Sequence, residues 1–301
     1  MTKSEVKNLA EEAIVLLQKM FGEGLVFECQ EYYKTNEALT GITLKLSSYF
    51  PIPMVCLDDL PDGTTAEEVA SITAAAFQDL IRNLSPLPAF PQMTRESVLK
   101  NVVLQALSRK RNRQMLKVHP HISFLDLAGI FRVPVGPYRK NSLNTALITN
   151  QIIDDLGLTV DELAEAARRN TLAKFGTQFG AAHEIALCAL TGRSCWSLDE
   201  ATMSEPGLYT LTNEIQINGA ALMLIPEILE KIGEKAGMDY YILPSSIHEV
   251  LISKDDGLLM AKELKEIVYK NNRMEVVVKQ EDVLSDNVYF YSRKRKELKI
   301  V

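Results

Sequence analysis

The last third of the chain alternates between two hydrophobic periods, and this alternation most limits the folds open to it. The segments with the strand period of two are GLYTLTN, DYYILPSS, HEVLIS and NVYFYSR. The segments with the helical period are NGAALMLIPEILEKIGEKAG, which is a helix pair or a helix kinked at Pro226, and DDGLLMAKELKEIVYKN. This order predicts an α+β fold in which helices cover mixed or antiparallel sheets.

The N-terminal part predicts an α-β-β-β-α order. Apolar residues three and four apart predict a helix over residues 4–20, and two alternating segments, LVFECQEYYK and LTGITLKLSS, predict antiparallel strands. FPIPMVCLDDL predicts an edge strand because its prolines lack an N–H. Thr64 or Thr65, followed by Glu67 or Glu68, forms a capping box that begins a helix over about 65–84.

The 301 residues are enough for two domains of ordinary size. Three prolines in SPLPAFPQ predict a rigid connector at 85–92, so we expect one lobe over 1–90 and a second α+β lobe over 91–301. Residues 171–205 have the weakest pattern.

The middle of the chain predicts a helix from Thr94 to about Arg109 and a strand in HPHISFLDLAGIFRVPV. Another strand is NTALITN. A second capping box, Thr159 with Glu162, begins a helix that we expect to stop at Asn170.

Charge and cysteine usage indicate the compartment. The net charge is −6, so no general attraction to nucleic acid or anionic membrane is expected. The chain has neither a run of 18 apolar residues nor a secretory signal, and its four cysteines lack zinc spacing. These features predict a soluble cytoplasmic protein with reduced thiols, no membrane partner and no metal.

The densest group of chemically active residue types is Pro244, Ser245, Ser246, His248 and Glu249. On a strand, Ser246 and His248 would share one face, while Ser245 and Glu249 would point to the other. A serine could then act as a nucleophile with His248 as its base, although the chain has no G-x-S-x-G elbow. The alternative is a strand end whose hydroxyls satisfy the backbone or contact a ligand.

A second cluster, Asn213, Asn218 and Gly219, lies between a strand and a helix. Asn218 is placed to cap the helix with its side chain, and the free amides near Gly219 could also bind an anionic ligand. The chain has no phosphate loop and no dinucleotide fingerprint, so we predict no nucleotide cofactor.

His119, His121 and Asp126 could supply metal ligands only if their strand bends, and we interpret them as ordinary core or surface residues. Two basic clusters are either solvated surface or contacts for an acidic partner or nucleic acid. They consist of Arg109, Lys110, Arg111, Arg113 and Lys117, and of Arg293, Lys294, Arg295, Lys296 and Lys299.

Three segments, TN...NGAA, PSSIHEV and VLSDNVY, occur in that order. Together they resemble a family of uncharacterised proteins of anaerobic Gram-positive gut bacteria that is grouped as a domain of unknown function. The likeness runs from about residue 95 to 292 and implies a bacterial, cytoplasmic protein. It implies no reaction, so no catalytic residue is carried over.

Three functions remain open from the sequence. The first is a binding protein that recognises a small molecule or a protein partner where segments 213–219 and 244–249 meet. The second is a hydrolase-like enzyme that uses Ser245 or Ser246 with His248. The third is an accessory protein that contacts nucleic acid through the two basic clusters.

Overall fold

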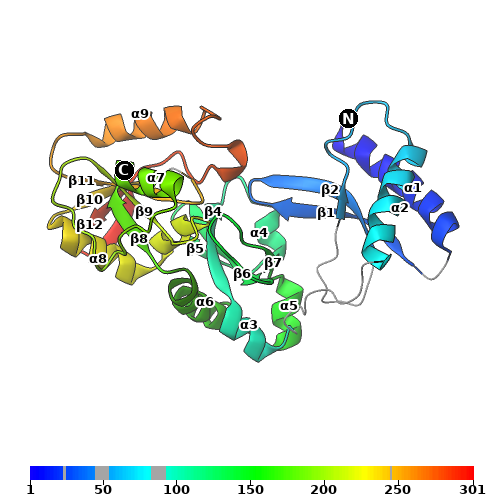
Figure 1. Cartoon of the computed structure of the whole chain (residues 1–301), viewed down its shortest axis with the longest axis horizontal. Coiled ribbons are helices and arrows are strands. Elements are labelled where there is room, and N and C mark those ends of the chain that lie inside the picture. The colour runs from blue at the N-terminus through cyan, green and yellow to red at the C-terminus, as the bar shows by residue number, and fades with distance from the viewer. Residues whose placement is uncertain (23–24, 45–53, 83–92, 245) are drawn as a thin grey trace. The chain divides into compact units, whose positions relative to one another are not determined.

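The structure is a computed structural model that describes residues 1–22, 25–44, 54–82, 93–244 and 246–301. Contacts divide the chain into two compact units, Met1–Met93 and Thr94–Val301 (Figure 1). Every strand pair among the described residues is antiparallel. The α+β class predicted from the sequence is therefore confirmed.

The first unit packs two helices on a three-stranded sheet of order β1-β2-β3. Both helices begin with capping boxes, Thr2 with Glu5 and Thr65 with Glu68. The predicted connector at 85–92 lies outside the described residues. The elements are α1 (Lys3–Phe21), β1 (Phe27–Lys34), β2 (Glu37–Leu44), β3 (Met54–Cys56) and α2 (Ala66–Arg82).

The second unit begins with a four-stranded sheet in which β6 pairs with β4, β5 and β7. Helix α6 packs on this sheet, and the Nδ2 of its Asn170 donates to the carbonyls of Leu99 and Val102, both at 2.9 Å. The elements are α3 (Arg95–Asn101), β4 (Val103–Ser108), α4 (Met115–Val118), β5 (His121–Phe124), β6 (Leu127–Pro134), β7 (Thr145–Leu147), α5 (Asn150–Leu156) and α6 (Val160–Phe175).

Three predictions for this region were wrong. The helix expected to reach Arg109 ends at Asn101, and strand β4 follows it. The sequence did not indicate this strand because all six of its residues are buried, and a strand buried on both faces shows no alternation. The strand expected in HPHISFLDLAGIF is a hairpin that turns at Leu125 and Asp126. Asn170 is not a helix stop, since α6 continues to Phe175.

The second unit continues with a six-stranded sheet of order β13-β12-β10-β11-β9-β8. The helices in this part of the chain include α7, which lies in the weakly patterned section 171–205, and the short 3-10 helices η1 and η2. The elements are β8 (Gln178–Ala181), α7 (Ala182–Thr191), β9 (Leu208–Thr212), η1 (Gly219–Leu224), α8 (Pro226–Ala236), β10 (Tyr240–Leu243), β11 (Val250–Lys254), α9 (Ala261–Asn271), η2 (Gln280–Asp282), β12 (Tyr289–Ser292) and β13 (Glu297–Ile300).

Helices α8 and α9 cover opposite faces of this sheet (Figure 1). The Tyr240 hydroxyl donates to the carbonyl of Leu229 in α8 at 2.8 Å, whereas Leu243 packs with Leu264 and Val268 of α9. Side chains of odd and even residues point to opposite faces of a strand, so Tyr240 and Leu243 contact different helices. As expected, the apolar segment splits at Pro226, where η1 gives way to α8.

Two polar segments lie at the ends of these strands. Pro244 and residues 246–249 lie between β10 and β11 and are not part of a strand, so the face assignment made for Ser246 and His248 does not apply. In the basic C-terminal segment, residues 293–296 are the turn of a hairpin formed by β12 and β13, with Lys296 at φ +52°, and Lys299 lies in β13.

Candidate functional site

The segment 213–219 folds back on itself through the side chain of Asn213. Its Oδ1 accepts from the Ile217 N–H at 3.3 Å, and its Nδ2 donates to the Ile217 carbonyl at 2.8 Å. Gln216 and Asn218 both have positive φ, which this tight loop requires. Asn218 precedes η1, but its side chain makes no capping hydrogen bond, in contrast to the prediction, because its own backbone is left-handed.

Gly219 brings this loop into contact with segment 244–249. A Cβ at position 219 would lie 2.5 Å from the main-chain oxygen of His248 and 2.8 Å from the Asn213 nitrogen. The same His248 oxygen accepts from the Thr212 hydroxyl at 2.8 Å. The two candidate segments therefore meet, and the contact depends on the missing side chain of Gly219.

The imidazole of His248 has a protein partner at each ring nitrogen. Nδ1 accepts from the Asn218 N–H at 3.2 Å, which places the proton of the neutral ring on Nε2. Nε2 lies 3.3 Å from Oδ1 of Asp282. The Ser246 hydroxyl accepts from the His248 main-chain N–H at 3.0 Å. Ser246 therefore contacts the backbone of His248, while the ring contacts Asn218 and Asp282.

A pocket of about 230 Å³ opens where the two segments meet. Helix α7 contributes one wall through Ala182, Ile185, Ala186 and Ala189, and the opposite wall is polar. The polar side chains come from three separate parts of the sequence: Asn141, the pair Thr212 and Gln216, and the pair His248 and Glu249.

Glu249 is the ionisable group of this wall that lacks a partner. Its side chain is partly buried, and burial raises the pKa of its carboxyl above the ordinary value. Its carboxyl oxygens take part in no hydrogen bond or ion pair within the described part of the chain. A carboxyl in this situation can accept a hydrogen bond or a cationic group from a ligand.

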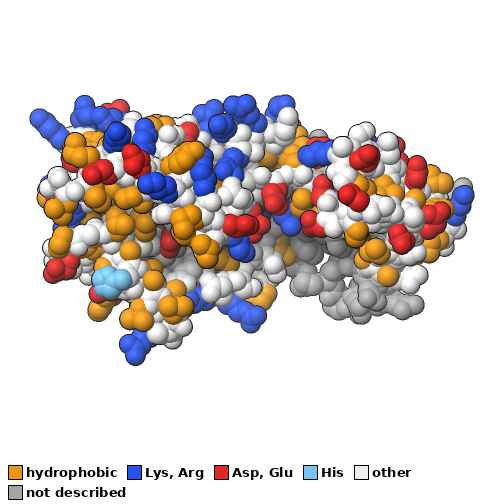
Figure 2. All heavy atoms as spheres, turned by 90° about the horizontal axis from the view of Figure 1, so that it is seen from above, with side chains coloured by type: hydrophobic (Ala, Val, Ile, Leu, Met, Phe, Trp, Pro, Cys, Tyr) orange, Lys and Arg blue, Asp and Glu red, His pale blue; other side chains and the backbone are white. Residues whose placement is uncertain are grey.

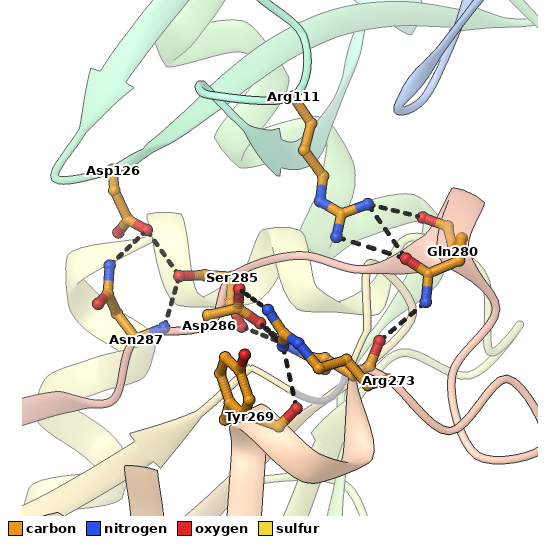
Figure 3. Close-up of polar contacts among 9 residues, drawn as sticks. Arg111, Asp126, Tyr269, Arg273, Gln280, Ser285, Asp286 and Asn287 are labelled. Atoms are coloured by element: carbon orange, nitrogen blue, oxygen red, sulfur yellow. Dashed lines mark hydrogen bonds and ion pairs between the residues drawn. The ribbon is translucent and has the colours of Figure 1, made fainter. Parts of the chain in front are cut away.

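The third family-like segment, VLSDNVY, is anchored to Asp126 (Figure 3). Asp126 accepts from the Ser285 hydroxyl at 2.6 Å, the Asn287 amide at 3.0 Å and the Tyr289 hydroxyl at 2.7 Å. Asp286, which follows Ser285 in this segment, forms an ion pair with Arg273 at 3.0 Å. The hairpin turn of the four-stranded sheet is thus joined to the six-stranded sheet by one carboxylate.

The two neighbouring histidines have separate environments. His119 is buried, its Nδ1 lies 2.8 Å from the Met115 carbonyl, and burial lowers the pKa of its ring. His121 places Nδ1 3.1 Å from the carbonyl of His119. Over the described ranges, no three His, Cys, Asp or Glu side chains are arranged to hold a metal ion.

The two basic clusters differ in their partners. In the C-terminal hairpin, Lys296 pairs with Glu230, Arg295 pairs with Glu297, and the Arg293 guanidinium donates to a carbonyl at 2.9 Å. In the first cluster, the Lys110 and Lys117 side chains have no hydrogen bond or ion pair to any residue that the structure describes. In the second cluster, three of the five cations thus have a polar partner among the described residues, whereas Lys110 and Lys117 of the first cluster have none.

Cys188, in the last part of α7, and Cys195, beyond its end, are joined as a disulfide, although the sequence favoured reduced thiols. Their C-x6-C spacing was visible in the sequence, but spacing does not show that the two Cα atoms lie 6.1 Å apart. Cys29 and Cys56 are free.

Several site residues were missed by the sequence analysis. Asp282 and Asn141 lie in segments that carry no catalytic pattern of their own, and Gln216 was passed over within the 213–219 segment. Asp282 directly precedes the VLSDNVY segment, and this position was the one available signal. Ser245, a candidate nucleophile, lies outside the described residues.

The fold and these contacts define an α+β protein in which segments 213–219 and 244–249 meet, with Asp282 beside them, directly before the third segment. The chain belongs to a family of unknown function, DUF5688, whose model matches residues 6–293. The predicted membership in a family of unknown function is confirmed, while the bacterial and gut origin stays a prediction. Searches of curated proteins and of solved structures found no match.

A helix that crosses a membrane must be long and mostly apolar. Among the described residues, no helix is both long enough and apolar enough to cross a membrane.

Proposed function

We propose that this protein binds a small molecule carrying an amine or amide group, in the pocket between α7 and the junction of segments 213–219 and 244–249. The observation that carries the proposal is Glu249, a partly buried carboxyl that faces the pocket without a partner in the described chain. A group of this kind is unfavourable in the empty protein and favourable once a ligand donates to it.

The walls of the pocket support a small polar ligand. At about 230 Å³ the pocket is smaller than the roughly 300–1,000 Å³ that drug-sized ligands occupy. Three alanines of α7 leave room on one side, while the amides of Asn141 and Gln216 offer donors and acceptors on the other. An apolar wall with a few convergent polar groups is typical of ligand sites.

The charge of the ligand follows from Glu249. The pocket contains no Lys or Arg among its lining residues, so an anionic ligand would meet a carboxyl without compensation. An amine would instead hold the Glu249 carboxyl in its ionised form and pair with it. An amide would donate to the carboxyl in either form.

The hydrolase alternative gains no support from this geometry. A base for a serine nucleophile needs a ring nitrogen free to accept the hydroxyl proton, and His248 uses Nδ1 for Asn218 and directs Nε2 at Asp282. Ser246 is engaged as an acceptor for the His248 N–H. The nucleophilic role of Ser245 stays a prediction.

A ligand-observed NMR screen of small amines, amides and carboxylates against the full chain tests the proposal. The matched pair of variants is Glu249→Gln and Glu184→Gln, since Glu184 is an exposed carboxylate on α7 outside the pocket lining. We expect amines or amides to bind the wild type and Glu184→Gln, and to bind Glu249→Gln at least tenfold more weakly. The proposal fails if only carboxylates bind, or if Glu249→Gln binds amines as tightly as the wild type.

A further inference from the structure

A second pocket, of about 410 Å³, lies beside the first basic cluster in the Thr94–Val301 unit. It is formed where β4 ends in the turns of residues 109–114 and where the β5–β6 hairpin turns back. Its ionisable lining consists of Arg109, Lys110, Arg113, Lys117, His121 and Asp126. Four permanent cations thus surround one cavity with a single carboxylate.

Most cations of this pocket have no polar partner among the described residues. The side chains of Lys110, Arg113 and Lys117 have neither an ion pair nor a hydrogen bond to any described residue, and all three are exposed. Figure 2 shows Lys and Arg side chains gathered along one edge of the unit. Clustered like charges repel one another, so the arrangement becomes favourable when an anion enters.

The base of the pocket is held in place by its own contacts. The Arg109 main-chain N–H donates to the Asp126 carbonyl and its guanidinium donates to the Leu125 carbonyl, both at 3.0 Å. Leu125 has φ +54°, a left-handed conformation that is strained for a leucine. Asn112, in the turn between the cations, is buried and donates to the Ser108 carbonyl at 2.8 Å.

Asp126 contributes a single negative charge against the four cations of the pocket. Its carboxylate is already occupied by the Ser285, Asn287 and Tyr289 donors (Figure 3). His121, which uses Nδ1 for a carbonyl, has Nε2 without a partner in the described residues. The net charge facing a ligand is therefore positive, and guanidinium and ammonium groups are the usual partners of phosphate oxygens.

We propose that this pocket binds a small molecule that carries two or more phosphate charges. The chain as a whole has a net charge of −6, which gives no long-range attraction to a nucleic-acid backbone. Screening confines the field of the four cations to about 8–10 Å at physiological salt, which suits a compact anion inside the cavity. This site is separate from the amine pocket and does not depend on it.

Isothermal titration of the full chain with inorganic pyrophosphate tests the inference. The double variant Lys110→Gln/Lys117→Gln removes two cations of the pocket, and Lys294→Gln, an exposed lysine of the C-terminal turn, is the control. We expect wild type and control to agree within about twofold and the double variant to bind at least tenfold more weakly. Because both lysines are exposed, the melting temperature should stay unchanged, which separates lost binding from lost folding.

Three results would overturn the inference. The first is the absence of pyrophosphate binding by the wild type, and the second is an equal loss of affinity in Lys294→Gln. In the third, a single-stranded oligonucleotide binds more tightly than pyrophosphate, with an affinity that falls steeply with salt, and the basic cluster is then a nucleic-acid contact. The amine screen reports on Glu249 and is unaffected by any of these results.

Discussion

Gly219 lies against the main-chain oxygen of His248, at a position where a Cβ would come within 2.5 Å of that oxygen. This contact joins two segments that are separated in the sequence by the rest of η1, by α8 and by β10. The atoms around position 219 belong mainly to backbone, which cannot move aside as a flexible side chain can.

Replacement of Gly219 by alanine should therefore destabilise the fold. We expect Gly219→Ala to lower the free energy of unfolding by about 2–3 kcal/mol, the scale of overpacking a tight site. Gly180→Ala is the control, because its nearest neighbours would be 3.4 Å or more from the new Cβ. Urea denaturation measures both, and equal effects of the two substitutions would contradict the role assigned to position 219.

The Glu249 carboxyl should make stability fall as pH rises. Its pKa is raised in the folded state above the ordinary value of 4.5, so between these two values the folded protein holds more protons than the unfolded chain. The free energy of unfolding then decreases with rising pH through that window. Glu249→Gln should be more stable than the wild type at pH 7 by about 1 kcal/mol, the scale for an unsatisfied buried group.

Denaturation of both proteins across pH checks this prediction. The advantage of Glu249→Gln should disappear below pH 4.5, where the wild-type carboxyl is protonated in both states. An advantage that does not change with pH would show that burial of the charge is not its cause.

Asp126 should be more important for stability than an exposed carboxylate. Asp126→Asn replaces an oxygen that accepts hydrogen bonds with a donor, which opposes the Ser285, Asn287 and Tyr289 donors. We expect a loss of about 2–3 kcal/mol, because buried partners lose their acceptor. Asp199→Asn, whose side chain is 73% exposed beside Lys231, should have a much smaller effect, because solvent screens an exposed ion pair. Similar losses in both variants would rule out a special role for the Asp126 contacts.

Burial of His119 should lower stability on the acid side. Its folded pKa is below the ordinary value of 6.5, so the unfolded chain binds more protons as pH falls through this range. Stability that is present above pH 6.5 is then lost at lower pH. His119→Gln should show a smaller loss between pH 7 and 5 in thermal denaturation, and an identical pH profile would refute the assignment.

The cysteines offer a chemical test. With Cys188 and Cys195 bonded, alkylation of the unfolded, unreduced protein should label two thiols, Cys29 and Cys56, and prior reduction should expose all four. Mass spectrometry counts the labels. Removal of the bond by Cys188→Ser/Cys195→Ser should cost roughly 2–3 kcal/mol, which is the loop-closure scale for a short loop. Four labels without reduction would support the reduced thiols expected from the sequence.

Local signals in the sequence determined much of the fold. Capping boxes at Thr65 and Thr159 and the proline at 226 placed helix boundaries correctly, because these residues act on backbone groups within one turn. The strand β4 was missed for the opposite reason. Its residues are buried on both faces, and a continuous apolar run does not distinguish a strand from a helix.

The candidate site also combines positions that the sequence identified with contacts that only the structure shows. The sequence alone identified Asn213, Gly219, His248 and Glu249 as positions of interest, since their residue types stand out in otherwise regular segments. Only the tertiary structure decided their roles, because Asn218 and Asp282 occupy the His248 ring and nothing in the described chain pairs with Glu249. Those contacts join residues that are tens of positions apart, and residue type and spacing do not specify which distant groups a folded chain brings together.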